Sequence, residues 1–414
     1  MMPDSRPQSS DFRAIGYGRQ SIDGGDISAV VEVLRSDWLT TGPKVEEFER
    51  VFARFCGARH AVAVSSGTAA LHCSVYAAGI GPGDEVIVSP MTFAASANCV
   101  LYCGGTPVFA DVEPETLLID PAETARKVTE RTKAIIAVDY AGQPCNYDAL
   151  RAVAEKYGLT LIADACHAVG GFYKGRPVGS LAHMSAFSFH PVKNMTTGEG
   201  GMITTDNTNY ADRMRSFRNH GIATDYRQRE TMGSWFYEMV DLGFNYRITD
   251  MQCALGISQL KKLPDWIARR RCIAAKYDDA FAKVSGVTPL GLRADVIPPS
   301  GNSDTPTLRH SETSSVHAYH LYVIRVSGDR TAIFRRLREA GIGVNVHYIP
   351  VHFHPYYREH LGTGPGLCPV AEAAYEGILS LPMFPGLSNA DVERVITEVK
   401  RAVCKKKTSS AHYP

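Results

Sequence analysis

The sequence lacks the features that identify several large classes of protein. No apolar run among its 414 residues is long enough to span a lipid bilayer. The opening stretch, MMPDSRPQSSDFR, has no apolar core of the kind found in secretory signal peptides. Charge of one sign is also scarce, because 44 basic residues face 43 acidic ones and the formal net charge is +1. We therefore expect a cytoplasmic protein that binds neither nucleic acid nor an anionic membrane.

Paired cysteines are missing as well. Ten cysteines are scattered along the chain without a single C-x-x-C pair, which favours reduced thiols over a disulfide framework. The hydrophobic share of 44% and the charged share of 21% are typical of a soluble enzyme. A chain of this length exceeds the size of one hydrophobic core, so two domains are expected.

Strand-like and helix-like segments alternate in the first part of the chain. HAVAVSS precedes GTAALHCSVYAAG, DEVIVSP precedes FAASANCVLYCG, and DALRAVAEKYG precedes LTLIADA. This alternation predicts an α/β fold with a mostly parallel sheet covered by helices on both faces, and such sheets carry their sites at the C-terminal ends of the strands. Beyond about Pro264 the pattern changes to a long helix, a polar loop, the strand-like HLYVIRV and further helices. We predict a disordered leader (1–11), a large domain (12–264), a smaller α+β domain (265–403) and a flexible tail (404–414).

A first candidate site lies where a strand should pass into a helix, at Ser66, Gly67, Thr68 and Ala69. The N-terminus of a helix offers unpaired N–H groups and a positive dipole end, which suit a phosphate. Gly67 would let the backbone approach a ligand closely, and Ser66 and Thr68 add hydroxyl groups. An ordinary helix cap would give the same pattern, and both interpretations stay open on these residues alone.

Two further signals follow other predicted strands. Asp164 is the first polar residue after LTLIA, where a carboxylate can pair with a protonated ring nitrogen, and His167 could reach the same ligand. A capping aspartate beside a core histidine would also explain this pattern. Phe93 follows DEVIVSP and could stack on a flat ligand or belong to the core.

Lys193 completes the set. In SAFSFHPVKNMTTGEGG it is the only fully charged residue between Ala186 and Gly198, just after a probable buried strand. A phosphate cradle, an acid for a pyridine nitrogen, a flat aromatic face and a lysine at a strand end together describe a site for pyridoxal 5′-phosphate. In such sites the lysine holds the cofactor covalently and the acid keeps its ring protonated.

The sequence resembles the DegT/DnrJ/EryC1/StrS family of nucleotide-sugar aminotransferases from about Ile15 to about Val403. The motifs that carry the resemblance are SSGTAAL, PMTFAASAN, ADACHAVGG, SFHPVKNMTTGEGG, GFNYRITDMQCALGISQL and VHYIPVH. The resemblance implies an aspartate-aminotransferase-like fold (fold type I) with a large domain that binds the cofactor. It also implies a homodimer with shared active sites.

The resemblance assigns roles to matching residues, and none of them is a metal ligand. Lys193, Asp164 and His167 would be catalytic. The cofactor would be bound by Ser66, Gly67, Thr68, Ala69, Phe93, Asp164, His167, Ser188 and Lys193, with Asn245 reaching its phosphate from the neighbouring subunit. The substrate would be bound by Tyr17, His190, Arg247, His347 and Tyr348.

Within the family, IGYGRQSID, VDYAGQP and SFHPVK look most like the transaminases of pseudaminic acid synthesis. That likeness implies transfer of an amino group from L-glutamate to C4 of a UDP-4-keto-6-deoxy-N-acetylhexosamine. The product would be UDP-4-amino-4,6-dideoxy-N-acetyl-β-L-altrosamine. Another UDP- or dTDP-4-keto sugar stays open, because the long polar segment 222–240, expected near the opening of the site, leaves the sugar contacts undefined.

Parts of the sequence also fit other classes of protein. His347, His352 and His354 lie close together in VHYIPVHFHP and could bind zinc, although their spacing matches no standard ligand signature. They could equally be loop histidines in a polar cleft or on the surface. Some deoxysugar dehydratases of the family carry histidine in place of the lysine, and Lys193 argues against that reaction. A non-catalytic member of the family is a further alternative.

Overall fold

The computed structural model describes residues 14–299 and 314–404, except residue 225. The predicted leader (1–11) and residues 405–414 of the predicted tail lie outside the described residues. Cys404, the first residue of the predicted tail, is instead the last residue of helix α13. No helix in the described part of the chain is both long enough and apolar enough to cross a membrane.

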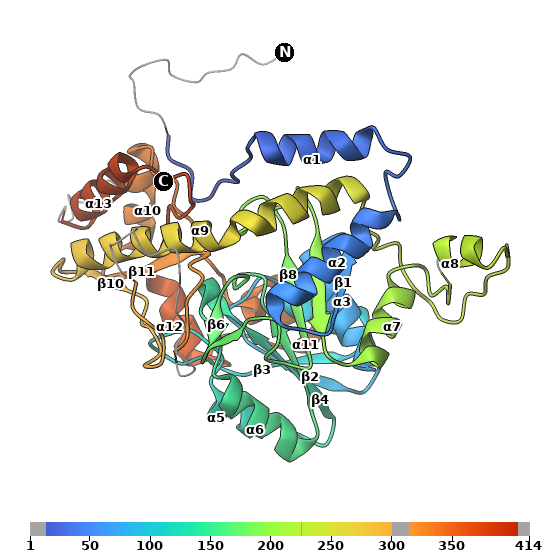
Figure 1. The fold of residues 1–414 in the computed structure, drawn as a ribbon. Coiled ribbons are helices and arrows are strands. Elements are labelled where there is room, and N and C mark those ends of the chain that lie inside the picture. The colour runs from blue at the N-terminus through green and yellow to red at the C-terminus, as the bar shows by residue number, and fades with distance from the viewer. Residues whose placement is uncertain (1–13, 225, 300–313, 405–414) are drawn as a thin grey trace, which may run out of the picture.

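A mixed sheet forms the centre of the molecule (Figure 1). Among the described residues its seven strands run in the order β1-β9-β8-β5-β4-β2-β3, and β9 alone is antiparallel to its neighbours. The strands are β1 (His60–Val64), β2 (Glu85–Val88), β3 (Thr106–Phe109), β4 (Thr132–Val138), β5 (Thr160–Asp164), β8 (Met184–Ser188) and β9 (Gly201–Thr205). The predicted mostly parallel α/β sheet is confirmed.

Two smaller sheets accompany it. A short hairpin pairs β6 (Phe172–Tyr173) with β7 (Arg176–Pro177). An antiparallel sheet joins β10 (Val287–Pro289), β11 (Tyr322–Val326) and β12 (Ile378–Leu381). The predicted strand HLYVIRV is thus β11, at the centre of the second of these sheets.

The helices begin and end at recognisable signals. Pro43 opens α2 and Gly57 closes it in a left-handed conformation, and Thr249 and Gln252 form a capping box at the start of α9. The α-helices are α1 (Gly24–Leu34), α2 (Pro43–Cys56), α3 (Gly67–Ala77), α4 (Ala95–Tyr102), α5 (Pro121–Arg126), α6 (Tyr147–Tyr157), α7 (Thr208–Phe217), α8 (Tyr226–Thr231), α9 (Asp250–Phe281), α10 (Arg330–Glu339), α11 (Pro355–Leu361), α12 (Pro369–Gly377) and α13 (Asn389–Cys404). Two 3₁₀ turns are η1 (Tyr140–Gly142) and η2 (Val351–Phe353).

Helix α9 links two hydrophobic cores. Its residues as far as Ile267 pack in the core of the main sheet, and those from Ile273 pack in a second core under β11, α10 and α13. The expected domain boundary at 264/265 falls inside the continuous helix α9, and along this helix the first core ends at Ile267 and the second begins at Ile273. Segments from 351 to 378 return to the first core, so the C-terminal part of the chain serves both.

The segment before α9 stands apart from this body. Helix α8 lies at the end of an extended loop at the edge of the molecule (Figure 1). Large apolar side chains between 232 and 244 are exposed there, with Trp235 at 87% and Leu242 at 74%. Contiguous exposed apolar residues of this kind mark a contact surface rather than an ordinary loop.

Candidate active site

The first turn of α3 holds the residues of the predicted phosphate cradle. Ser66 is the N-cap of the helix, and its hydroxyl accepts a hydrogen bond from the Ala69 N–H at 3.1 Å. Ser66 therefore caps α3 through the Ala69 N–H, and the phosphate role of Ser66 and Ala69 stays a prediction. By the geometry of an α-helix the N–H groups of Gly67 and Thr68 have no carbonyl one turn earlier, so these two groups are suited to an anion.

Gly67 brings this cradle against the end of β8. A Cβ atom at Gly67 would lie 2.7 Å from Ser188 Cβ and 3.2 Å from Cys166 Sγ, which leaves no room for a side chain. Ser188, the last residue of β8, is consequently placed beside the start of α3. The C-terminal ends of β1, β5 and β8 meet at this point.

Asp164 ends β5 and is buried, with 6% of its surface exposed. Its Oδ2 accepts a hydrogen bond from Ser96 Oγ at 2.6 Å, and its Oδ1 accepts one from the Cys166 N–H at 3.2 Å. Ser96 is held in turn by the Thr92 hydroxyl at 2.6 Å. These donors fix the carboxylate in one orientation at the edge of the sheet.

Lys193 lies in the loop that follows β8. Its backbone N–H donates to the His190 carbonyl at 2.9 Å, and Asn194 bridges the carbonyls of Val169 and Ala318. Burial lowers the pKa of the Lys193 amine, an effect that the nearby Cys166 thiol and Asp164 carboxylate oppose. The chain therefore holds a lysine that loses its proton more readily than a solvated one.

His167 is buried beside this lysine. Its Nε2 lies 2.9 Å from the Tyr348 hydroxyl, and its ring centroid is 4.4 Å from that of His320. Burial and the Lys193 amine hold the pKa of His167 well below its usual value, so its ring is neutral. The Nδ1 atoms of both histidines are buried without a hydrogen-bond partner in the described part of the chain.

The predicted substrate residues divide into two groups. His347 is buried, its Nδ1 is 2.8 Å from Ser380 Oγ, and burial lowers its pKa to about 4. The half-buried Tyr17 places its ring 5.4 Å from that of His347. Together with Tyr348 these residues lie near Lys193.

Phe93 and His190 line the outside of the same region. Phe93 is 63% exposed, two residues before α4, and its ring is 6.3 Å from that of Tyr348. The alternative that Phe93 is a core residue is therefore wrong. His190 is exposed in the loop that precedes Lys193.

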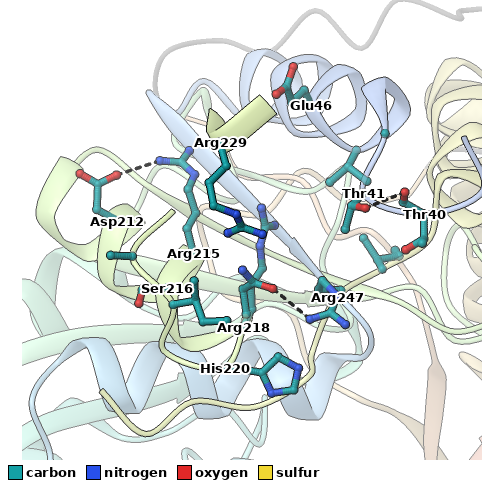
Figure 2. Close-up of a pocket in the computed structure, with 16 residues that line it drawn as sticks. Thr40, Thr41, Glu46, Asp212, Arg215, Ser216, Arg218, His220, Arg229 and Arg247 are labelled. Carbon is teal, nitrogen blue, oxygen red and sulfur yellow. Dashed lines mark hydrogen bonds and ion pairs between the residues drawn. The ribbon is translucent and has the colours of Figure 1, made fainter. Parts of the chain in front are cut away.

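Asn245 and Arg247 belong to a different region. Asn245 is exposed and pairs through its backbone with Asn219, and Arg247 donates to Asn219 Oδ1 at 2.9 Å (Figure 2). The loop that carries them contacts the end of β1, where the Ser65 N–H donates to the Tyr246 carbonyl at 2.8 Å. No contact joins either side chain to the Lys193 group in the described part of one chain.

Three residues around Lys193 were not identified from the sequence. Ser96 binds Asp164, His320 packs against His167, and the Tyr140 hydroxyl donates to the His347 carbonyl. The one available signal for Ser96 was a second polar residue in PMTFAASAN. His320 and Tyr140 lie in apolar runs that look like ordinary core.

The neighbouring histidines do not converge on a metal. His347 contacts Ser380, whereas His352 Nε2 pairs with Glu372 at 2.9 Å. Across the residues that the structure describes, no group of three His, Cys, Asp or Glu side chains is arranged to hold a metal ion.

Comparison with known proteins identifies the family to which this chain belongs. The sequence profile of the DegT/DnrJ/EryC1/StrS aminotransferase family matches residues 20–400. The chain belongs to this family. Its cofactor is pyridoxal phosphate, and the chain is a transaminase with the fold of the family's aminotransferases.

Several members of the family are similar over nearly their whole length. The chain is 43% identical to the spore coat polysaccharide biosynthesis protein SpsC of Bacillus subtilis, over 94% of this chain and 96% of that one. It is 33% identical to Spr1654 of Streptococcus pneumoniae in its PLP form, to which a sugar-aminotransferase activity is attributed, with a TM-score of 0.85 and coverage of 94% and 99%. It is 32% identical to Helicobacter pylori PseC, an aminotransferase involved in pseudaminic acid synthesis, with a TM-score of 0.83 and coverage of 94% and 99%.

The residues present fit this cofactor. The close contact of Gly67 with Ser188 brings the first N–H groups of α3 beside the Ser188 hydroxyl, and His167 offers a buried Nδ1 without a partner in the described part of the chain. A fixed carboxylate and a lysine of lowered pKa lie at the same edge of the sheet. This donor set matches the phosphate, ring and aldehyde groups of pyridoxal phosphate.

We predict that Ser96→Ala weakens cofactor binding about tenfold, because it removes a hydrogen bond to the charged Asp164 worth about 1.5 kcal/mol. Ser74→Ala is the matched control, since Ser74 is also buried but its hydroxyl donates to the Ala70 carbonyl. The dissociation constant of pyridoxal phosphate is measured by absorbance titration. Equal affinity in the two variants would contradict the role of Ser96.

Proposed function

We propose that this enzyme transfers the amino group of L-glutamate to C4 of a UDP-4-keto-6-deoxy-N-acetylhexosamine. The product would be UDP-4-amino-4,6-dideoxy-N-acetyl-β-L-altrosamine, as in pseudaminic acid synthesis. The observation that carries the proposal is a lysine of lowered pKa beside a fixed, buried carboxylate at the C-terminal edge of the sheet. The similarity to PseC over nearly the whole chain supports the choice of substrate.

In the proposed reaction each residue has a defined task. Pyridoxal phosphate, when bound, supplies an electron sink that acidifies the C–H bond next to the transferred nitrogen. Lys193 holds the cofactor and, once released from it, moves the proton as a general base. Its lowered pKa suits this task, because more of the amine is neutral near neutral pH. Asp164 keeps the ring nitrogen protonated, and Gly67 and Thr68 bind the phosphate.

A different 4-keto sugar is the second candidate. The chain is 43% identical to SpsC, a protein of spore coat polysaccharide synthesis, but only 32% identical to PseC. A UDP- or dTDP-linked 4-keto sugar of another series is therefore the alternative substrate.

We further propose a homodimer in which Asn245 of one subunit reaches the cofactor phosphate of the other. Asn245 is exposed and follows the apolar stretch that includes Trp235 and Leu242. Burial of that stretch against a second copy would remove apolar surface from water and carry the GFNYR loop with it.

The substrate proposal predicts a ranked response to a panel of sugars. With L-glutamate as donor, the purified enzyme should aminate the UDP-4-keto-6-deoxy-N-acetylhexosamine at least tenfold more efficiently, in kcat/KM, than its dTDP-linked and epimeric counterparts. Product stereochemistry is read by NMR. A higher kcat/KM on a dTDP-linked or epimeric sugar would reject the pseudaminic acid assignment in favour of the second candidate.

Covalent attachment of the cofactor should map to Lys193. Borohydride reduction of the holoenzyme followed by peptide mass mapping should place a phosphopyridoxyl group on this residue. Lys174→Ala is the control, because Lys174 is exposed and paired with Asp148, and this variant should keep the label. Lys193→Ala should lose the label and at least about a hundredfold of turnover, since proton transfer by a positioned base contributes about 10²–10⁴-fold. A label on Lys174 or Lys261 would refute the assignment.

The shared site predicts complementation between two inactive variants. Lys193→Ala and Asn245→Ala are mixed under conditions that allow subunits to exchange. One site of each heterodimer would then carry both lesions and the other site neither. In an equal mixture about half of the dimers are heterodimers, so about a quarter of all active sites would be intact. Activity should rise toward about a quarter of that of the wild type. If exchange is verified by native mass spectrometry and the mixture stays inactive, Asn245 serves its own chain.

A further inference from the structure

A buried glutamine on α9 joins two segments that lie beside Lys193. Gln259 is 1% exposed, and its Oε1 accepts a hydrogen bond from the Thr196 N–H at 3.3 Å. Its Nε2 donates to the Ser21 carbonyl at 2.9 Å and to Asp26 Oδ2 at 2.7 Å. A side-chain amide carries an acceptor and two donors on different atoms, so one glutamine can bind a separate segment through each. Gln259 thus connects the loop of Lys193 with the segment that leads into α1.

The loop on the acceptor side of Gln259 is closed on itself. The Thr196 hydroxyl donates to the Phe189 carbonyl at 2.9 Å, and the Thr197 N–H donates to the same carbonyl at 3.0 Å. Lys193 lies between these two ends. Because the ends of the loop are tied together, a segment that is held at Thr196 is also held at a fixed distance from the lysine.

The segment on the donor side, residues 15–23, is called the strap below. Near its start the Tyr17 carbonyl accepts a hydrogen bond from the Met383 N–H at 3.0 Å. A Cβ atom at Gly18 would lie 3.4 Å from Val192 Cβ, so the strap is in van der Waals contact with the residue that precedes the lysine. The strap therefore forms one wall of the region around Lys193, and Tyr17 projects from it.

An ion-pair cluster holds the far end of the strap. Asp26 in the first turn of α1 is 1% exposed, and Lys262 Nζ lies 2.8 Å from its Oδ1 and 2.6 Å from Asp23 Oδ1. Helix α1 lies along α9, which carries both Lys262 and Gln259 (Figure 1). A buried carboxylate is costly without hydrogen-bond donors, and the Gln259 amide is one of those that Asp26 has.

We propose that Gln259 is a positioning residue that holds the strap against the Lys193 loop and so keeps Tyr17 in place for the keto sugar. A leucine, such as Leu260 or Leu263 on the same helix, would fill the space but could bind neither segment. The choice of the keto sugar as the affected substrate rests on the proposed function, whereas the attachment of the strap does not.

Gln259→Met tests the attachment, because it keeps the length of the side chain and removes its hydrogen bonds. Hydrogen exchange of the holoenzyme, followed by mass spectrometry, should become about tenfold faster in peptides that cover residues 14–23. In single-turnover measurements the half-reaction with the keto sugar should slow about tenfold, while the half-reaction with L-glutamate changes less than about threefold. General destabilisation would slow both half-reactions.

Thr204→Val is the matched control. It also removes a buried hydrogen bond, from the Thr204 hydroxyl to the Gly179 carbonyl at 2.7 Å, but neither residue belongs to the strap or the Lys193 loop. It should leave both half-reactions and the exchange of residues 14–23 unchanged. If Gln259→Met does not fold, Gln259→Glu replaces it. The carboxylate keeps the acceptor for Thr196 but opposes Asp26, so the strap should again exchange faster.

A double-mutant cycle tests whether Gln259 acts through Tyr17. Tyr17→Ala should slow the half-reaction with the keto sugar, and adding Gln259→Met should cause less than about a twofold further loss. Additive losses, or equal exchange of the strap in the wild type and Gln259→Met, would overturn the proposal. Faster exchange without turnover of any nucleotide sugar would reject the proposed function and keep the attachment, and sugar turnover with unchanged exchange would do the reverse.

Discussion

The close approach of α3 to β8 is the constraint on which the site depends. Gly67 has no room for a Cβ against Ser188, and Gly201 has none against the Ser66 carbonyl, where a Cβ would lie 2.3 Å from the oxygen. Because both positions are glycine, the first turn of α3 can pack directly against the neighbouring strands β8 and β9. That contact brings the α3 N-terminus next to the residues that follow β5 and β8. A side chain at either position would move the first turn of α3 away from the Asp164 carboxylate and the Lys193 amine.

The sequence predicted the parts of the site that follow from local pattern. Asp164 and Lys193 could be found because each is a single polar group after an apolar run, and parallel strands bring such positions to one edge. Contacts between distant segments could not be found in this way. Ser96 and Asp164 are 68 residues apart, and Tyr348 and His167 are 181 apart, so no period or spacing in the chain relates them.

The same limit applies to the continuity of α9 across the expected boundary and to the cavity beside α7, which four arginines line (Figure 2). A change of pattern near Pro264 suggested a division, but a proline within a long helix does not end it when tertiary packing holds both sides, and α9 packs against both cores. The cavity arginines are spread from 215 to 247 over two helices and a loop. In sequence they look like solvated charges, and only the fold collects them.

The surroundings of Lys193 and the cavity beside α7 differ in charge, and the difference follows from burial. Around Lys193 the histidines 167, 320 and 347 are buried, and both burial and the lysine depress their pKa values, so they remain neutral. Because these histidines are neutral, they add no positive charge that would disfavour a protonated ring nitrogen beside Asp164. The arginines are instead concentrated around the open cavity, where contact with solvent removes most of the free-energy cost of burying a charged guanidinium. Burial thus keeps the histidines around Lys193 neutral, whereas the arginines around the open cavity keep their charge.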